Sequence, residues 1–309
     1  MEKFVGMVVR IDGAQVTVRD PGGGEWRCVL RGRLRKELTG STSPLAVGDR
    51  VDVMPAREGD GVVDKLHPRR SRLARRAVLG HDAAHRGTSR TRPPREHVLA
   101  ANLDLAVVVV AAPPRQTVID RHLALIRRGD CQALLCVNKI DLIPSGSVEG
   151  VIASYRHSGI PVLLTSVVTG EGVADLRESL AGKLVALVGP SGGGKSSLLN
   201  AMDPSLGLRT GDLTSRGRGS HTTNSSSTYA VADALVVDTP GLREIGFLEN
   251  EGLDATEDLF PEITALAGGC WFRDCAHTHE PRCAVKAALE AGFLEPEVYR
   301  RYARLARSG

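Results

Sequence analysis

A glycine-rich loop that ends in lysine and serine carries the strongest chemical signal in this chain. Residues 189–196 read Gly-Pro-Ser-Gly-Gly-Gly-Lys-Ser, a full match to the pattern G-x-x-x-x-G-K-S. Glycines let the backbone curl so that successive N–H groups and the start of the following helix point at phosphate groups. In such a loop Lys195 neutralises the β- and γ-phosphate oxygens, and the Ser196 hydroxyl binds Mg²⁺. The residues expected at the phosphates are Gly189, Pro190, Ser191, Gly192, Gly193, Gly194, Lys195, Ser196 and Ser197.

A guanine-selecting motif precedes this loop. Asn138-Lys139-Ile140-Asp141 closes a strand-like run at 133–137, about fifty residues upstream. The Asp141 carboxylate can accept two hydrogen bonds from the N1–H and N2–H₂ groups of guanine, and adenine lacks that pair of donors. Asn138 can serve the opposite edge of the base, and the stem of Lys139 can lie against its face. Alone these residues indicate only a loop, but paired with a phosphate loop they predict GTP as the ligand.

Two more loops complete the set. Asp238-Thr239-Pro240-Gly241 ends the apolar run 234–237. Asp238 would hold the water shell of Mg²⁺, and the Gly241 amide would face the γ-phosphate. Thr165-Ser166-Val167 follows the run 161–164 and reads as the short loop that contacts the base, through Ser166 and Val167.

The order of these motifs is unusual. Most GTPases run from the phosphate loop through D-x-x-G to N-K-x-D and the short base loop, whereas this chain meets N-K-x-D first. The cyclic order is unchanged, so the same parallel sheet can form, because folding depends on which strands pair and not on where the termini fall.

On these motifs, together with His221-Thr222-Thr223 and D-T-P-G-L-R-E-I-G, the chain resembles the circularly permuted GTPases. Within them it is similar to the ribosome small subunit-dependent GTPase A (RsgA, or YjeQ) family, and the resemblance covers nearly the whole chain. One departure is Gly193, where the family more often carries valine. We expect this glycine to loosen the loop slightly without removing a ligand.

Catalysis requires further groups between the phosphate loop and D-T-P-G. A threonine of this segment must reach Mg²⁺ and the γ-phosphate, and Thr223 is the first choice with Thr222 as the alternative. Leu242 stands where Ras-like proteins keep a glutamine that orients water, so intrinsic hydrolysis should be slow. The resemblance implies that His221 directs the water once the ribosome orders the segment; otherwise His221 contacts only RNA or solvent. Lys195, Thr223 and His221 are the expected catalytic residues.

A cysteine cluster near the carboxyl terminus has the spacing of a metal site. Cys270, Cys275, His277 and Cys283 form C-x₄-C-x-H-x₅-C. Three thiolates and an imidazole match a closed, tetrahedral structural zinc site, one per chain. His279 competes by spacing, and the family pattern favours His277. The remaining cysteines, Cys28, Cys131 and Cys136, read as buried side chains.

Charge is concentrated in one stretch. Residues 65–95 hold ten Lys and Arg against one acid, Asp82, so this stretch carries +9 while the whole chain carries +4. We interpret it as a linker that also touches RNA backbone, with a purely solvated linker as the alternative. Arg300, Arg301, Arg304 and Arg307 near the end form either a solvated face or a second RNA contact. There is no run of eighteen apolar residues and no secretory signal, so we expect a cytoplasmic chain with no membrane partner.

The elements that must position these groups fall into separate units. Five short alternating strands within 1–68, at 4–11, 15–19, 26–31, 50–54 and 62–66, suit a small barrel of the OB type, a frequent nucleic-acid platform. From residue 102, buried strands alternate with helices, which predicts an α/β domain, and helices around 283–291 and 297–307 should pack on the metal. The expected division is an OB-fold RNA-binding domain at 1–70, a basic linker at 71–100, a circularly permuted P-loop GTPase domain at 101–262 and a mainly helical zinc-binding domain at 263–309.

The resemblance implies a monomeric GTPase that binds the small ribosomal subunit and its rRNA, hydrolyses GTP to GDP with Mg²⁺ during late maturation of that subunit, and then leaves. Two other hypotheses stay open. One is a GTP-gated rRNA-binding module with negligible hydrolysis, which Leu242 favours. The other is a P-loop ATPase or kinase, against which Asn138 and Asp141 argue.

Overall fold

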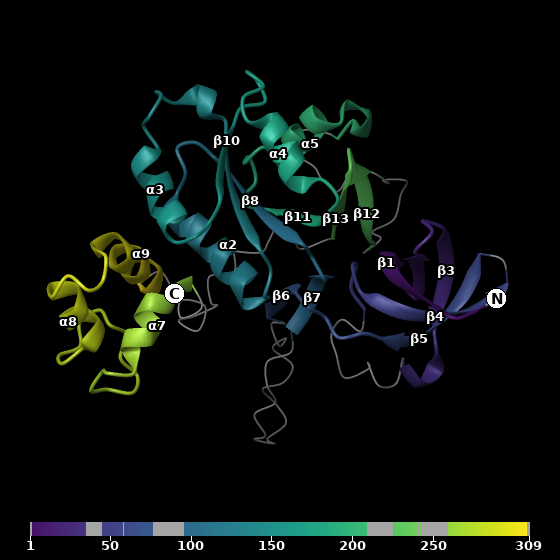
Figure 1. Cartoon of the computed structure of the whole chain (residues 1–309), viewed down its shortest axis with the longest axis horizontal. Coiled ribbons are helices and arrows are strands. Elements are labelled where there is room, and N and C mark those ends of the chain that lie inside the picture. Colours follow the sequence, from purple (N-terminus) through teal and green to yellow (C-terminus); the bar gives the residue numbers. More distant parts are fainter. Residues whose placement is uncertain are drawn as a thin grey trace, which may run out of the picture.

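The computed structural model describes residues 2–34, 45–57, 59–76, 96–208, 225–239, 242 and 259–307. It has three parts (Figure 1): a β-barrel at the amino-terminal end, a central sheet with helices on both faces, and a small helical unit at the carboxyl-terminal end. This is the predicted multidomain architecture. Within the described residues, no helix combines the length and the apolar character that a bilayer crossing requires.

The amino-terminal strands close into a five-stranded barrel. Their order is β1-β2-β3-β5-β4, and β1 also pairs with β4. Alternate residues point inward because successive side chains of a strand face opposite ways, and Val8, Val16, Val18 and Val53 form the centre of the barrel core. The strands are β1 (Phe4–Asp12), β2 (Gln15–Arg19), β3 (Glu25–Leu30), β4 (Arg50–Arg57) and β5 (Asp60–Leu66).

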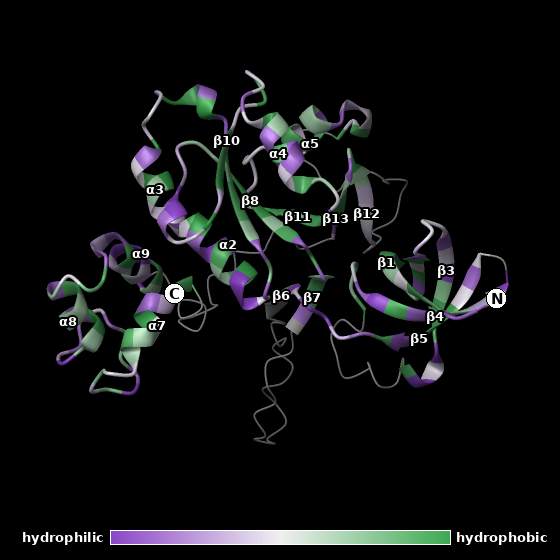
Figure 2. Ribbon diagram, viewed as in Figure 1, coloured by the Kyte–Doolittle hydropathy of each residue, from purple (hydrophilic) through white to green (hydrophobic). Residues whose placement is uncertain are grey.

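The central sheet has the strand order β10-β9-β8-β11-β13-β12, in which only β12 runs antiparallel to its neighbour. Its inner strands are apolar on both faces, as parallel strands between two helix layers must be, and they form the green centre of Figure 2. The strands are β8 (Leu105–Ala111), β9 (Ala133–Asn138), β10 (Val162–Thr165), β11 (Leu184–Val188), β12 (Ser226–Val231) and β13 (Ala234–Asp238).

Helices cover both faces of this sheet. One face packs against α2 (Gln116–Arg128) and α3 (Glu149–His157). The other packs against α4 (Val173–Leu180) and α5 (Lys195–Met202). Two short 3₁₀ turns, η2 (Ile140–Leu142) and η3 (Pro204–Leu206), follow β9 and α5.

The barrel and the central sheet share backbone hydrogen bonding. Strand β1 pairs with β12, with Arg10 opposite Ser227 and Ile11 opposite Ser226, so the strands form one eleven-stranded sheet. A bulge in β1 between Val8 and Arg10 separates the residues that pair with β4 from those that pair with β12, while β1 stays paired with β2 on both sides of it. The pairing covers the edge strand of the central sheet, which otherwise exposes unpaired backbone groups. Because Ser227 also lies opposite Asp238, one cross-strand row runs from the barrel to the end of β13.

A hairpin within the predicted linker was missed by the sequence analysis. Strands β6 (Arg72–Arg76) and β7 (Glu96–Ala101) pair antiparallel and flank residues 77–95, which lie outside the described residues. Leu73, Leu99 and Ala100 are buried in it. Three of the five residues of β6 are arginines, so the strand has no clear apolar alternation. Its partner strand lies about twenty residues away in the sequence.

Two arginines of the predicted RNA-contacting stretch instead hold parts of the protein together. The Arg69 guanidinium donates to both carboxylate oxygens of the fully buried Asp49, at 2.7 and 2.8 Å. Arg70 pairs with Asp104, the residue before β8. The bidentate pairing of Arg69 is geometrically specific and engages its guanidinium within the protein, whereas the side chain of Arg70 remains 63% exposed.

The carboxyl-terminal unit contains α7 (Pro261–Ala267), α8 (Ala284–Glu290) and α9 (Pro296–Ala306). It packs beside α2 and α3 (Figure 1), with Tyr302 and Ala303 of α9 in the same apolar core as Leu123 of α2. One arginine of α9, Arg301, is only 2% exposed and contacts Asp120 of α2. It is therefore neither part of a solvated face nor an RNA contact, the two roles that the sequence suggested.

Candidate functional site

The four loops singled out in the sequence meet at one edge of the central sheet. Strands β9, β10, β11 and β13 all run parallel, so their carboxyl ends share an edge. These ends are Asn138, Thr165, Val188 and Asp238, each directly at or before a predicted loop. Open α/β sheets bind their ligands at that edge.

The glycine-rich loop leads directly into α5. Gly189, Gly192 and Gly194 have φ angles of +131°, +80° and +95°. Residues that carry a Cβ rarely adopt such backbone angles. The buried Lys195 begins α5, and its Nζ donates to the carbonyls of Gly189 (2.7 Å) and Pro190 (2.8 Å). The loop therefore gathers an ammonium group and a helix amino terminus at one point, which favours a bound anion.

Gly193 packs closely against β8, so its effect is more than the slight loosening of the loop that was expected. A Cβ built there would lie 2.7 Å from the backbone oxygen of Val109 on β8. Real Cβ atoms do not approach a backbone oxygen so closely. The glycine therefore lets the loop lie against β8, and a valine at this position would require the loop or the strand to shift.

The Asn138 side chain connects the guanine motif to the phosphate loop and to the end of β10. Its side chain is 1% exposed, its Nδ2 donates to the carbonyl of Gly193 (3.1 Å), and its Oδ1 accepts from the hydroxyl of Thr165 (3.1 Å). The amide retains one N–H and one lone pair beyond these two bonds, which are the groups that the predicted contact with the base requires. Its structural role was not predicted.

Asp141 is held by Ser166 across the next loop. The Ser166 hydroxyl donates to Asp141 Oδ1 at 2.6 Å, while Asp141 itself is exposed at the sheet edge. Lys139 adopts a left-handed backbone conformation, with φ +63°, at the turn between β9 and η2. A carboxylate fixed by one oxygen and open at the other edge can accept the paired donors of a guanine. The neighbouring Val167 is exposed.

On the magnesium side, Asp238 ends β13, and the buried Ser196 begins α5 beside Lys195. Leu242 is 4% exposed and belongs to the apolar core, so its side chain faces away from water. His221, Thr222, Thr223 and Gly241 lie outside the described residues.

The cysteine cluster forms a second candidate site, a metal centre. The ligand atoms of Cys270, Cys275, His277 and Cys283 all lie within 4.8 Å of one another. The Sγ atoms of Cys270 and Cys283 are 3.8 Å apart, and His277 Nδ1 lies 3.4 and 3.5 Å from them. His279 is exposed and not part of the cluster. Four such ligands could hold a metal ion. The other three cysteines are buried as predicted, and burial raises their thiol pKa values, to about 11 for Cys28 and Cys136 and about 12 for Cys131.

Hydrogen bonds shape the loop that carries the candidate metal ligands. The Glu280 carboxylate accepts from the backbone N–H groups of Ala276 (3.0 Å), Thr278 (3.0 Å) and His279 (3.1 Å). Although partial burial opposes ionisation, these donors lower the pKa of Glu280 to about 2. Tyr299 of α9 donates to the carbonyl of His277 at 2.8 Å, so the loop is also fastened to the last helix.

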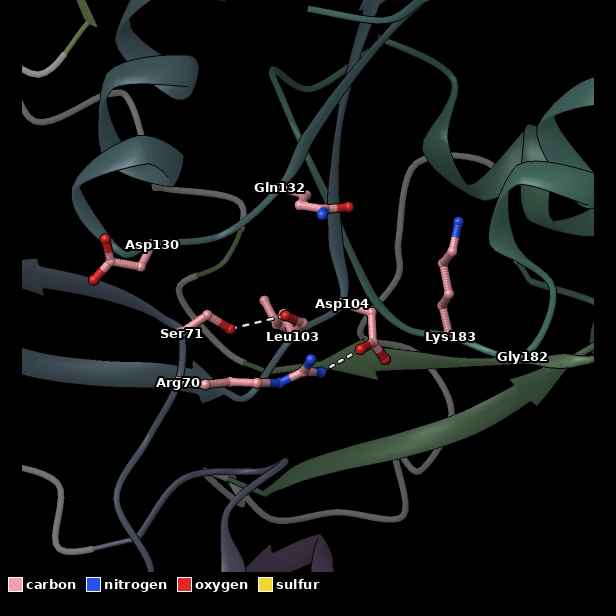
Figure 3. A pocket seen from close by; sticks show the side chains of 8 residues that line it. All are labelled: Arg70, Ser71, Leu103, Asp104, Asp130, Gln132, Gly182 and Lys183. Atoms are coloured by element: carbon pink, nitrogen blue, oxygen red, sulfur yellow. Dashed lines mark hydrogen bonds and ion pairs between the residues drawn. The ribbon is translucent and has the colours of Figure 1, made fainter.

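A pocket opens at the opposite edge of the central sheet, away from the four loops. Figure 3 shows its lining, in which Arg70 pairs with Asp104 and the Ser71 hydroxyl donates to the carbonyl of Leu103 (2.8 Å). Its residues come from the amino-terminal ends of β8, β9 and β11 and from the segment before β6. These bonds join that segment to the sheet, and none of the predicted site residues lies there.

Known proteins match this chain over nearly its whole length. The family model described as RsgA GTPase matches residues 83–248. A protein of Porphyromonas gingivalis named small ribosomal subunit biogenesis GTPase RsgA is 39% identical, over 96% of this chain and 94% of its own. One of the same name from Gemmatimonas aurantiaca is 37% identical, over 97% and 95%.

Two solved structures share the fold. The crystal structure of YjeQ from Thermotoga maritima is 30% identical with a TM-score of 0.71, over 99% of this chain and 98% of that one. YloQ, titled a circularly permuted GTPase, is 28% identical with a TM-score of 0.65, over 99% and 94%. With the guanine motif, the phosphate loop and Asp238 arranged at one sheet edge in permuted order, the chain belongs to the RsgA GTPase family and is a circularly permuted GTPase.

Proposed function

We propose that this protein binds the small ribosomal subunit through its rRNA, hydrolyses GTP to GDP and phosphate during late maturation of that subunit, and then dissociates. The relatives that match almost the whole chain carry the name small ribosomal subunit biogenesis GTPase. The observation that carries the proposal is the convergence of the guanine motif, the phosphate loop and the end of β13 on one sheet edge, where Asn138 bonds to the phosphate loop and to the end of β10. In this role the protein works as a monomer in the cytoplasm.

The direct test is GTP turnover titrated with purified small ribosomal subunits. We expect slow turnover by the protein alone, because the position after D-T-P-G is a leucine, and a saturable rise as subunits are added. Large subunits serve as the control for general ribosomal RNA. Turnover that does not respond to small subunits, in a protein that binds GTP, would contradict the proposal.

A second candidate function is a GTP-gated rRNA-binding module with negligible hydrolysis. The burial of Leu242 favours it, because an apolar side chain turned into the core cannot align a water molecule. The same titration separates the two functions. The gated module would bind subunits in a GTP-dependent manner without faster turnover.

Within the nucleotide site, we assign guanine contacts to Asn138, Lys139, Asp141, Ser166 and Val167. Phosphate contacts are assigned to the loop from Gly189 to Ser197 and to Gly241, and Mg²⁺ coordination to Ser196, Thr223 and Asp238. The supporting observations are the hydrogen bond between Ser166 and Asp141 and the position of Lys195 and Ser196 at the start of α5.

Asp141→Asn should weaken GTP binding by one to two orders of magnitude, where each decade is about 1.4 kcal/mol. An amide would place an N–H₂ donor against the donors of guanine, while the bond from Ser166 could still be accepted by its oxygen. Equilibrium titration with a fluorescent GTP analogue, with xanthosine triphosphate in parallel, measures the effect. Xanthine presents an acceptor at the 2-position, so the variant should gain relative affinity for it. Unchanged GTP affinity would remove Asp141 from base recognition.

At the cysteine cluster we propose one structural Zn²⁺ per chain. With Zn–S bonds of about 2.3 Å and Zn–N bonds of about 2.0–2.1 Å, a tetrahedral site has S···S edges of about 3.8 Å and S···N edges of about 3.5–3.6 Å. The observed separations of 3.8 Å and of 3.4 and 3.5 Å agree with those edges. Four protein ligands leave no open position, so the ion would hold the loop and not react.

Cys270→Ser and Cys275→Ser should each lower the zinc content, measured by elemental analysis, and should loosen the carboxyl-terminal unit, measured by limited proteolysis. GTP affinity should stay near the wild-type value because the nucleotide loops lie on the central sheet. Cys131→Ser is a matched control, since that cysteine is buried outside the cluster. If both cluster variants keep a full equivalent of zinc, the ligands lie elsewhere.

A further inference from the structure

The carboxyl-terminal unit displays aromatic side chains to solvent. Trp271 is 68% exposed, the adjacent Phe272 is 42% exposed, and Phe293 is 86% exposed. Among the described residues, no other aromatic side chain appears among the exposed large apolar groups. Large exposed aromatic residues mark interaction sites more often than isolated aliphatic ones do. Trp271 and Phe272 are consecutive and lie on the loop between two metal-ligand cysteines.

Trp271 is not a loosely held side chain. The guanidinium carbon of Arg282 lies 4.9 Å from the centroid of its ring, and the Trp271 backbone N–H donates to the Arg282 carbonyl at 3.3 Å. Arg282 has a φ of +56°, a left-handed conformation that costs energy for a residue other than glycine. The surrounding loop therefore imposes this conformation and places the cation over the ring.

Two cysteines of the candidate metal centre are the sequence neighbours of this pair. Cys270 precedes Trp271 and Cys283 follows Arg282, and the two Sγ atoms are 3.8 Å apart. Trp271 and Arg282 are thus each one residue away from a cysteine of the cluster, which restricts the positions of both side chains. Rigid aromatic groups lose little conformational entropy when a ligand stacks on them, so a surface built in this way is prepared for a planar partner.

The chemistry of the surface favours a nucleobase over a protein side chain. A tryptophan face and a guanidinium plane are the groups on which unpaired bases stack. Exposed Arg273, which follows Phe272, adds a second cation that can meet the phosphates of such a strand, although exposed Asp274 offsets part of this charge. Glu280 also keeps its negative charge here, because its carboxylate is stabilised in the ionised form by three backbone N–H groups, so it offsets a further part of the positive charge.

We propose that Trp271 and Arg282 form a platform on which one unpaired nucleobase of RNA stacks, with Arg273 contacting an adjoining phosphate. This inference rests on the proposed function in that the small subunit supplies the RNA. It adds a contact surface, far from the nucleotide loops, whose geometry depends on the metal centre.

The first experiment detects stacking itself. The chain has two tryptophans, and Trp26→Phe leaves Trp271 as the single fluorophore. We expect oligouridylate and oligoadenylate of ten nucleotides to quench its emission saturably at low salt, and quenching to weaken when Arg282→Ala is added. Trp26 bonds to Asp20 in the barrel (2.8 Å), so basal GTP turnover must be shown to be unchanged in the Trp26→Phe background. Emission that does not respond to either oligonucleotide would overturn the proposal.

The second experiment measures affinity for small subunits by sedimentation. Trp271→Ala should raise the Kd by about 5- to 150-fold, which corresponds to the 1–3 kcal/mol that stacking of one base contributes. Trp271→Tyr, which keeps an aromatic face, should recover most of the affinity. Phe293→Ala is the control, since this phenylalanine is even more exposed than Trp271 but lies in the turn between α8 and α9 and belongs to neither element of the platform. Basal GTP turnover should be unchanged in all three.

The outcomes separate this inference from the function on which it rests. If wild-type protein binds small subunits and Trp271→Ala binds them within about twofold, the platform proposal is wrong and the proposed function stands. If wild-type protein neither binds small subunits nor responds to them, the proposed function fails, and the quenching experiment still decides whether a base stacks. If Trp271→Ala loses subunit binding but RNA does not quench Trp271, the surface binds a ribosomal protein and the nucleobase assignment is overturned.

Discussion

Replacing Arg301 with methionine is expected to lower the free energy of unfolding by about 3–5 kcal/mol, the usual cost of leaving a buried charge without its partner. Arg301 Nη2 and Nε donate to Asp120 Oδ1 at 2.8 and 3.3 Å, and both side chains are almost fully buried. The guanidinium also lies over the ring of Tyr155, 4.2 Å from its centroid. Methionine would keep much of the volume and remove all of the charge. Urea unfolding with and without the substitution measures the loss.

A double variant shows that the loss comes from the orphaned carboxylate. Asp120→Asn combined with Arg301→Met removes both charges, and the asparagine oxygen can still accept from the Tyr155 hydroxyl, which lies 3.0 Å from Asp120. We expect the pair to recover most of the stability that the single substitution loses, because neutral replacements of a buried ion pair are often well tolerated. Arg300→Met is the control. Its guanidinium is exposed and paired with Glu297 at 2.8 Å, and such surface pairs contribute about 0–1 kcal/mol.

The deficit of Arg301→Met should also depend on pH. Burial raises the pKa of Asp120, and the charge of Arg301 opposes that rise. Without the arginine, the folded-state pKa rises further above the unfolded value. Between those two values the folded protein binds a proton that the unfolded chain lacks, so stability falls as pH increases. The variant should therefore be closest to wild type under mildly acidic conditions and furthest from it above neutrality. If the loss of stability in Arg301→Met is the same at mildly acidic pH and above neutrality, lost packing and not the charge is responsible.

Local chemistry explains why so much of the nucleotide site could be predicted. The phosphate loop needs a strand before it and a helix after it, and the structure has both, at Leu184–Val188 and Lys195–Met202. The same holds for the barrel, where alternation of apolar residues located all five strands to within a few residues. Turns and periodicity are properties of short segments, so one sequence is enough to find them.

Contacts between distant segments could not be predicted in this way. Arg69 and Arg301 read as charges available to solvent or RNA, yet each is paired with a buried aspartate of another part of the chain, Asp49 and Asp120 respectively. Asp120 and Arg301 are 181 positions apart, and no local pattern connects them. Gly193 shows the same limitation, because its close approach to the Val109 carbonyl exists only after β8 is placed beside the loop.

His221→Ala is expected to reduce small-subunit-stimulated GTP turnover by about ten- to a thousandfold, the scale of losing one group that orients or activates water. Lys195 and Ser196 supply charge and a hydroxyl at the start of α5, so GTP binding does not require the histidine. Leu242 is buried in the apolar core and cannot align the attacking water. Another polar group must do so, and His221 is the sole histidine in the segment between α5 and β12.

The pattern of effects distinguishes a catalytic role from a binding role. GTP affinity should stay within about threefold of wild type, a change below 1 kcal/mol, and the slow basal rate should hardly change. His221→Gln should retain more stimulated turnover than His221→Ala, because an amide can also orient water, as the glutamine of Ras-like proteins does. Single-turnover kinetics with saturating small subunits isolate the chemical step from subunit release. Stimulated turnover at the wild-type level in His221→Ala, with subunit binding intact, would mean that the water is positioned by a group of the ribosome or by another residue of this chain.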